Sequence, residues 1–535
     1  MQSSGSGDSK LPGTIFLFSI LVFPVAITIK ICNITGARSC IIPRWEDPRS
    51  CDIFYNQKVM LNLFRQSAVR SASIELCSFS VLRLCKNPFL VTSQPPSTSS
   101  GLQSCTMATL AVPSIASKTS GIEKSVWVEF IQLALEVKPL NLGQGFPDFA
   151  APDTVRKALA QACCSETNVL LNQYTRGFGH PRLVAALTKL YSKLIGRELN
   201  PLSEVLVTAG AYEALFVTIM GLVNEGDEVI IIEPFFDCYV PQVKLAGGNP
   251  VFVPLRPKKT EGVTSSADWV LDPVELASAF NDKTKAIIVN TPNNPLGKVF
   301  THDELMMIGD LCKKHNSIAI MDEVYEWMTY DGWEHIRMAT LPGMWERTIT
   351  IGSAGKTFSV TGWKTGWAYG PASLMKGPQV IHQHSVYTCT TPVQEAVAQG
   401  FEIELERFGT PECYFLSLPA ELKVKRNNIV KILTDAGLNP IIPEGGYFIL
   451  ADVRDIASKV DVGGDINERK DFRFVKWLSR NRKLQGIPPS AFYCPEHGNI
   501  GENYIRFCFI KEDENLEKAG NILKALKKDI DEGKV

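Results

Sequence analysis

The sequence has few metal-binding residues, and those it has are not grouped. Only seven histidines occur in 535 residues, and no H-E-x-x-H sequence is present. The fourteen cysteines are scattered and include no C-x-x-C pair. Closely spaced cysteine and histidine ligands are typical of zinc sites and of small disulfide frameworks, so the sequence indicates neither. We expect reduced cysteines, as in an intracellular enzyme.

An excess of charge of either sign is also absent. The chain has 55 basic and 56 acidic residues, which gives a net charge of -1. It has no basic patch with interleaved aromatic residues, so we expect no nucleic-acid partner. Hydrophobic residues make up 45% and charged residues 21%, which is typical of a globular protein. The length allows one large domain or two to three ordinary ones.

Residues 1–118 differ in character from the rest and form a predicted N-terminal extension. Residues 11–29 carry no charge and have nearly the length of a membrane span or a signal-peptide core, although Pro24 weakens a straight helix. Residues 60–92 are basic and serine-rich, with Glu75 as their only acid, as in a mitochondrial transit peptide. We interpret residues 93–118 as a flexible linker.

These two signals point to different compartments. An apolar N-terminus is typical of the secretory route, whereas the segment behind Met60 is typical of mitochondrial import. We expect translation to start at Met60, or at Met107 for a cytoplasmic form, with the preceding residues as a gene-level extension. The predicted location is mitochondrial, with the cytoplasm as the alternative. A membrane tether requires that segment 11–29 is real and retained.

From residue 120 the sequence alternates between strand-like and helix-like runs. Four runs, at 228–232, 285–290, 317–321 and 348–352, are dominated by apolar residues, and residues 302–315 form a helical stretch between two of them. Continuous apolar strands separated by helices indicate an α/β fold with a mostly parallel sheet covered on both faces. Ligands of such sheets bind at the carboxyl ends of the strands.

Residues with distinct chemistry follow these strands. Lys356 lies in a small-residue loop, where partial desolvation and the nearby Lys364 would lower its pKa and make it a nucleophile and base. Asp322 ends a buried strand, where it is ionised only if hydrogen bonds or a cation such as a protonated pyridine nitrogen compensate its charge, although it could equally be a helix N-cap. Asn294 and Tyr325 can both hydrogen-bond a phenolic oxygen.

The remaining candidates complete a set of ligands for pyridoxal phosphate. The turn Gly210-Ala211-Tyr212 opens a helix behind a strand and can bind a phosphate together with Ser353 and Lys364. Phe236 can stack on a ring. A pyridine, an aldehyde, a phenol and a phosphate are the parts of this cofactor.

A competing interpretation comes from Ser353-x-x-Lys356 followed by Lys364-Thr365-Gly366. This pair imitates two sequence boxes of penicillin-binding serine acylases. The second box follows far too soon, however, and no Ser-Asp-Asn box lies between the two. The sequence therefore disfavours a serine acylase.

Three long runs carry a resemblance to a known family. They are Asn-Leu-Gly-Gln-Gly-Phe-Pro-Asp-Phe at 141–149, Asn-Thr-Pro-Asn-Asn-Pro-Leu-Gly-Lys-Val-Phe at 290–300 and Pro-Gly-Met-Trp-Glu-Arg-Thr-Ile-Thr-Ile-Gly-Ser-Ala-Gly-Lys-Thr-Phe-Ser at 342–359. The chain from about residue 122 onward resembles fold-type I aminotransferases, and within them the kynurenine aminotransferases, also called glutamine transaminase K or cysteine-S-conjugate beta-lyases. The runs at 175–180 and 411–415 are most similar to the third isoform.

The resemblance implies a domain organisation and roles for individual residues. It implies an N-terminal arm and part of a small domain at 119–160, a large cofactor-binding domain at 161–410 and a small domain at 411–535. Lys356 would bind the cofactor aldehyde, Asp322 its ring nitrogen, and Asn294 and Tyr325 its phenolic oxygen. The phosphate would be held by Gly210, Ala211, Tyr212, Ser353 and Lys364, the substrate carboxylate by Gly145, Asn294 and Arg506, and the substrate side chain by Trp127, Phe236 and Tyr387. Tyr174 would reach the cofactor of a neighbouring subunit, which implies a homodimer.

The resemblance also implies the reaction. The amino group of L-kynurenine, glutamine, methionine or aromatic amino acids would pass to a 2-oxo acid such as oxoglutarate or glyoxylate, with kynurenic acid as the product from kynurenine and beta-lyase activity on the side. Beta-lyase as the main activity is one alternative. A catalytically silent binding protein is another, although it predicts the loss of Lys356, Asp322 or Arg506, and all three are present.

Two positions depart from the family pattern. Glu213 stands where family members have a glycine, and its negative charge beside the phosphate turn is expected to weaken phosphate binding slightly. Tyr387 occupies a position that is aromatic but varies within the family, which leaves substrate selectivity open.

Overall fold

The computed structural model describes residues 19–22, 25–28, 114–120, 122, 125–259 and 262–535, which belong to two compact units, Met1–Ala108 and Thr109–Val535. In the first unit β1 (Ser19–Val22) and β2 (Val25–Thr28) pair antiparallel within the apolar segment 11–29. The transit-like segment 60–92 and most of the linker 93–118 lie outside the described residues. Within the described part, no helix is long and apolar enough to cross a membrane.

Seven strands form the central sheet of the second unit. Their spatial order is β4 (Val205–Thr208), β13 (Gly366–Tyr369), β12 (Thr348–Ser353), β11 (Ile318–Asp322), β10 (Thr284–Asn290), β5 (Glu228–Glu233) and β6 (Asn249–Pro254). Neighbouring strands from β12 to β6 pair parallel, whereas β13 runs antiparallel to both β12 and β4. The prediction of a mostly parallel sheet is therefore confirmed.

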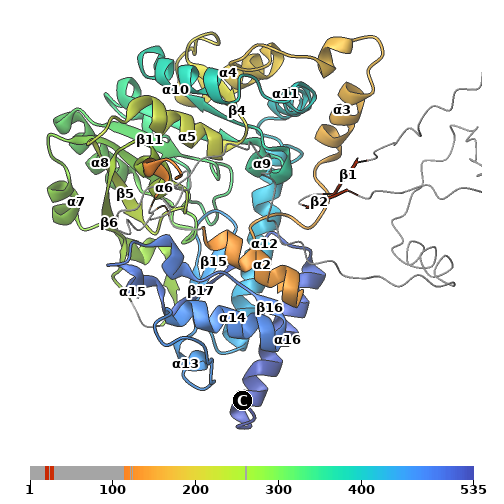
Figure 1. The fold of residues 1–535 in the computed structure, drawn as a ribbon, viewed down its shortest axis with the longest axis vertical. Coiled ribbons are helices and arrows are strands. Elements are labelled where there is room, and N and C mark those ends of the chain that lie inside the picture. Colours follow the sequence, from red (N-terminus) through yellow and green to blue (C-terminus); the bar gives the residue numbers. More distant parts are fainter. Residues whose placement is uncertain (1–18, 23–24, 29–113, 121, 123–124, 260–261) are drawn as a thin grey trace, which may run out of the picture. The chain divides into compact units, whose positions relative to one another are not determined.

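Helices cover both faces of this sheet, as Figure 1 shows, and this explains why its strands are mostly apolar. Ile231 of β5 packs in one core cluster with α5 (Ala211–Leu222), whereas Ile230 packs in another with α8 (His302–His315). Successive side chains of a strand point to opposite faces, so a strand covered on both sides has no polar alternation. Helix α8 has the predicted bounds and begins at a capping box formed by Thr301 and Glu304.

Four further helices lie near the β4 edge of the sheet, either against β4 itself or against one another. They are α3 (Asp153–Cys163), α4 (Pro181–Ile195), α10 (Ala372–Ser385) and α11 (Thr391–Glu406). Helix α11 packs against α3 and α4, and α10 packs against α5. The domain boundary suggested at 160/161 falls inside α3.

A second sheet of four strands belongs to the smaller part of the fold. Its order is β17 (Tyr504–Cys508), β15 (Phe448–Asp452), β14 (Asn439–Ile442) and β8 (Thr264–Ser265). The helices α12 (Tyr414–Asp435), α14 (Lys470–Arg482) and α16 (Asp513–Asp531) accompany this sheet (Figure 1). Because β8 comes from the sequence range of the large domain, the two parts of the fold do not follow one cut in the sequence.

The N-terminal helix α2 (Val126–Val137) and the loop after it complete the small part. The spacing of apolar residues predicts this helix, and its buried face packs against α14. The two-residue strand β3 (Leu140–Asn141) then pairs parallel with β16 (Leu484–Gln485). This pairing fixes the start of the glycine-containing loop at 143–145, which follows β3 directly.

Candidate active site

A cavity of 320 Å³ opens at the carboxyl ends of the strands of the central sheet. All predicted site residues line it except Tyr174 and Tyr387. Those that do are Trp127, Gly145, Gly210, Ala211, Tyr212, Phe236, Asn294, Asp322, Tyr325, Ser353, Lys356, Lys364 and Arg506. The volume is that of a small-molecule site. Residues up to 379 positions apart in the sequence therefore share one cavity, although their chemical roles remain predictions.

The register of the parallel strands places the polar residues at their carboxyl ends side by side across the sheet. Asn290 on β10 pairs with Asp322 on β11, and Asp322 pairs with Ile351 on β12. The Asn290 side chain donates to the carbonyl of Asp322 at 2.9 Å and accepts the backbone N–H of Asn294 at 2.7 Å. Asn290 therefore orients the loop that carries Asn294. Sequence reasoning missed it because it looked like the last residue of a strand.

Lys356 lies in a four-residue helix, α9 (Ala354–Thr357), where the sequence predicted an open loop. Its Nζ donates to the hydroxyl of Tyr447 at 2.5 Å, and that hydroxyl donates to the carbonyl of Gly145 at 2.9 Å. Burial lowers the pKa of Lys356 from 10.5 to about 8, and Lys364, which the sequence suggested as a cause, contributes least. The amine is thus about one-tenth deprotonated at pH 7 and about half at pH 8, so it can act as a base.

Asp322 is a buried carboxylate with an unused oxygen. Only 4% of the residue is exposed, and burial raises its pKa from 3.8 to about 6. Tyr239 donates its hydroxyl to Oδ2 at 2.5 Å, whereas Oδ1 has no hydrogen-bond partner among the described residues. A protonated ring nitrogen of pyridoxal phosphate would supply both the missing donor and the missing positive charge.

The phosphate turn is shaped for close approach of a ligand. Gly210 is the N-cap of α5 and has φ 82°, a conformation that favours glycine. A Cβ added there would come within 3.4 Å of Lys364 Nζ, and one added at Gly366 within 2.5 Å of the N atom of Ala211. The first N–H groups of a helix have no partner within the helix, so this turn and Lys364 together suit an anion such as a phosphate.

Arg506 is the other buried charge of the cavity. It is 0% exposed, and its guanidinium donates through Nη1 to Asn294 Oδ1 at 2.8 Å and through Nη2 to the carbonyl of Gly143 at 2.7 Å. Both acceptors are neutral oxygens, and Nε has no partner among the described atoms. Burial lowers the pKa of Arg506 from 12.5 to about 10. A substrate carboxylate would give this cation its counter-charge.

Two predicted site residues lie outside the cavity. Tyr174 is 84% exposed and Tyr387 56% exposed, and their rings meet edge-on at 6.0 Å. Tyr387 has φ 69°, which is unusual for a residue with a side chain. The structure therefore does not bring Tyr387 into the side-chain pocket of its own chain, where the sequence expected it.

Two tyrosines of the site were missed by sequence reasoning. Tyr447 binds Lys356, and Tyr239 binds Asp322. Tyr239 ends the run Glu-Pro-Phe-Phe-Asp-Cys-Tyr, and Tyr447 follows the glycine pair at 445–446, so each stands beside a loop signal. Neither position predicts which distant side chain the hydroxyl reaches.

The fold and the site together define an aminotransferase that depends on pyridoxal phosphate. Residues 137–523 match the aminotransferase class I and II family, and the chain belongs to this family. The residues of the cavity fit the cofactor, since a buried carboxylate with one unpartnered oxygen among the described residues, a lysine and an anion-binding turn face one space. The interpretation as a serine acylase is wrong, because the chain belongs to the aminotransferase family.

Particular relatives narrow the class. The chain is 53% identical to kynurenine–oxoglutarate transaminase 3 of Mus musculus over 432 residues, which cover 80% of this chain and 94% of that protein. It is 54% identical to the Homo sapiens protein of the same name over 411 residues, with coverage of 77% and 90%. The solved structure of Bna3p, a putative kynurenine aminotransferase from Saccharomyces cerevisiae, superposes with a TM-score of 0.72 at 37% identity and covers 78% of this chain and 100% of that one.

Proposed function

We propose that this aminotransferase uses L-kynurenine as an amino donor, together with glutamine, methionine or aromatic amino acids, and passes the amino group to a 2-oxo acid. The names of relatives that are 53–54% identical support kynurenine. The observation that carries the proposal is the placement of Arg506, a buried cation bonded only to neutral oxygens, in the same cavity as Lys356 and Asp322.

Each residue has a task in this reaction. When bound, pyridoxal phosphate supplies an aldehyde that takes up the amino group and a ring that withdraws electrons from the substrate Cα. Lys356, with a pKa of about 8, would accept the Cα proton at Nζ and hold it there for its return. Asp322 holds a proton on the ring nitrogen, and Arg506 orients the substrate by its carboxylate.

The walls of the cavity favour an aromatic or other apolar side chain. Trp127, Phe236 and Phe448 line it, and the Arg506 guanidinium lies 4.1 Å from the Phe448 ring and 5.2 Å from the Trp127 ring. Such rings contribute a large apolar contact area to ligand binding. An aryl side chain like that of kynurenine suits this surface.

Half of the reaction can be observed without an acceptor. We would record the absorption spectrum of the purified protein with pyridoxal phosphate before and after adding L-kynurenine or L-glutamine, with no 2-oxo acid present. Loss of the lysine-linked cofactor band with gain of the amino form of the cofactor is the expected result, and Lys356→Ala should not show it. An unchanged band with L-kynurenine would refute kynurenine as a donor.

We also propose cysteine-S-conjugate beta-lyase activity as a side reaction. Removal of the Cα proton by Lys356 would leave an electron pair at Cα. This pair can take up a proton again, or it can expel a leaving group from Cβ. Product analysis distinguishes the two outcomes, since elimination yields pyruvate and ammonia and transamination yields the corresponding 2-oxo acid. If a cysteine S-conjugate yields more pyruvate than the 2-oxo acid of the intact conjugate, elimination is the main path for that substrate.

We propose that two copies of the chain form a homodimer. Support comes from four exposed apolar or aromatic side chains, of which Tyr174 and Tyr387 contact each other: Val169, Leu170, Tyr174 and Tyr387, with exposed fractions of 60%, 69%, 84% and 56%. Large exposed apolar patches mark interaction surfaces. Light scattering after size exclusion should give twice the chain mass, and Leu170→Asp should shift it toward the monomer; a wild-type monomer would refute the proposal.

For localisation we propose mitochondria, on the basis of the basic, acid-poor segment 60–92, with a cytoplasmic form starting at Met107 as the alternative. N-terminal sequencing of the native protein tests this. A mature N-terminus within or just after 60–92 is the expected result, and recovery of residues before Met60 would refute it. Carbonate extraction of membranes tests a tether through residues 11–29.

A further inference from the structure

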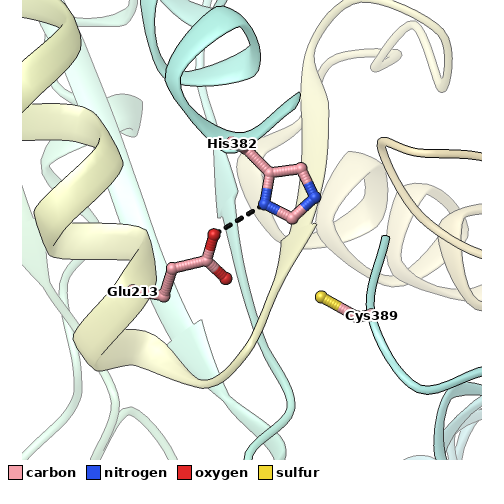
Figure 2. Close-up of side chains that lie close together, drawn as sticks. All are labelled: Glu213, His382 and Cys389. Carbon is pink, nitrogen blue, oxygen red and sulfur yellow. Dashed lines mark hydrogen bonds and ion pairs between the residues drawn. The ribbon is translucent and has the colours of Figure 1, made fainter. Parts of the chain in front are cut away.

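Behind the phosphate turn, three side chains from distant parts of the sequence meet, as Figure 2 shows. They are Glu213 of α5, His382 of α10 and Cys389 of the segment after α10, and their nitrogen, oxygen and sulfur atoms lie within 4.8 Å of one another. His382 is 0% exposed. Its Nδ1 lies 2.7 Å from Glu213 Oε1, and its Nε2 lies 2.9 Å from the carbonyl oxygen of Gly177.

The partners of His382 define its state. A backbone carbonyl can only accept hydrogen bonds, and an ionised carboxylate can likewise only accept them. Nε2 must therefore carry a hydrogen, and one further proton lies between Nδ1 and the Glu213 carboxylate, so the pair as a whole has no net charge. The sequence assigned no role to His382 and predicted only that Glu213 weakens phosphate binding.

The spacing indicates a shared proton and not a shared metal ion. Two ligands at about 2.05 Å from a tetrahedral zinc ion lie about 3.3 Å apart, whereas 2.7 Å is an ordinary charge-assisted hydrogen bond. The thiol of Cys389 is directed at the carbonyl of Val207 at 3.8 Å, and burial raises its pKa to about 12.

Glu213 links this pair to the cofactor site. It is the third residue of α5, and its second carboxylate oxygen accepts the backbone N–H of Ala209 at the start of the turn. This bond stabilises the turn that presents Gly210 and Ala211 to the cavity. The same carboxylate would repel a phosphate bound at the helix N-terminus unless a cation neutralised it.

We propose that Glu213 and His382 are positioning residues for the cofactor phosphate: the carboxylate shapes the turn at 209–212, and the proton that it shares with His382 cancels the charge that would repel the phosphate. This replaces the expectation that Glu213 weakens phosphate binding, which considered the carboxylate alone. Through Gly177 the pair also joins the phosphate turn to the segment that carries Tyr174. The inference rests on the cofactor of the family and not on kynurenine as the substrate.

A double-mutant cycle tests the charge. We would measure the dissociation constants of pyridoxal phosphate and of pyridoxal, which lacks the phosphate, for wild type, Glu213→Gln, His382→Gln and the double variant. Glutamine at 213 can accept from Ala209 and donate to a neutral His382, so we expect less than about threefold change. His382→Gln leaves the carboxylate without its counter-charge and should weaken pyridoxal phosphate about tenfold or more.

The pattern across the cycle separates the charge from packing. His382→Gln should leave the pyridoxal dissociation constant within about twofold, and adding Glu213→Gln should restore pyridoxal phosphate binding. Equal loss of both ligands, or no restoration in the double variant, would refute the proposal. His384→Gln, at an exposed position on the same helix, is the matched control and should bind like wild type.

Two further outcomes are decisive. If His382→Gln fails to fold, recovery of folding in the double variant supports the uncompensated carboxylate as the cause, and failure of both refutes it. If equimolar Zn²⁺ raises the melting temperature of the wild type and remains bound after dialysis, and Glu213→Gln abolishes both effects, the cluster is a metal site and the proton-sharing pair is refuted.

Discussion

Asp322→Asn should change how the stability of the cofactor-free protein depends on pH. The carboxylate is almost fully buried, and among the described residues Tyr239 is its only side-chain donor. Burial raises its pKa in the folded chain to about 6 from the ordinary 3.8. Because the folded state then binds the proton more tightly than the unfolded state, ionisation of Asp322 destabilises the fold as the pH rises.

The size of this effect follows from the two pKa values. Below pH 3.8 both states are protonated and the residue costs nothing, and above pH 6 the full difference applies. At about 1.36 kcal/mol per pH unit the difference amounts to about 3 kcal/mol. About 1.3 kcal/mol of it develops between pH 5 and pH 7. Asparagine does not ionise, so the variant should become more stable relative to wild type by that amount over this interval.

Urea unfolding of both cofactor-free proteins at pH 5, 6, 7 and 8 measures this difference. Any constant effect of the asparagine amide cancels, because only the change with pH is compared. The difference should rise up to about pH 6.5 and then level off. A difference that stays constant or falls with pH would refute the argument that Asp322 is held ionised at a cost. Added pyridoxal phosphate should stabilise wild type more than the variant, since only the carboxylate pairs with a ring cation.

Three other substitutions test the site. Lys356→Ala should lower amino-transfer activity by more than about a thousandfold while the protein still binds pyridoxal phosphate, as equilibrium dialysis would show; retained activity would remove Lys356 from the reaction. Arg506→Lys keeps a cation but loses the fork that bonds Asn294 and Gly143, so the KM for the amino donor should rise about tenfold or more with a smaller change in kcat; an unchanged KM would contradict carboxylate binding. Gly145→Ala would put a Cβ 2.3 Å from Phe448 Cζ, and thermal unfolding should show a loss of about 1–3 kcal/mol; a stability equal to wild type would show that Phe448 can move.

The parts of the fold that the sequence predicts correctly are those set by local pattern. Strands β5, β10, β11 and β12 are apolar because both of their faces are buried, and that pattern needs no knowledge of distant residues. Asp322 and Lys356 were found for a related reason: a charged residue directly after a buried strand is costly to bury and therefore indicates a binding or catalytic role. Their place at one edge of the sheet then follows from parallel pairing.

What the sequence could not predict depends on contacts between distant side chains. The hydroxyl of Tyr447 meets Lys356 across 91 residues, and His382 meets Glu213 across 169. Glu213 looks like an isolated charge in the sequence, and only the packing of α10 against α5 reveals its partner. Strand β8 is hidden for the same reason, because two residues have no periodicity and acquire their partner β14 from the tertiary fold.

The three ionisable groups at the centre of the cavity share one property that explains why the cofactor and substrate bind there. Burial shifts the pKa of Asp322 up to about 6, of Lys356 down to about 8 and of Arg506 down to about 10, in each case toward the neutral form. Elsewhere in the fold a buried cation such as Arg426 has its own carboxylate, Asp331, at 2.6 Å. A chain that could pair its charges in this way leaves these three without full compensation, so an occupant that is cationic near Asp322 and anionic near Arg506 relieves the cost of both. The folded protein without ligands thus carries the free-energy cost of these buried charges, and relief of this cost favours the binding of pyridoxal phosphate and of an amino acid.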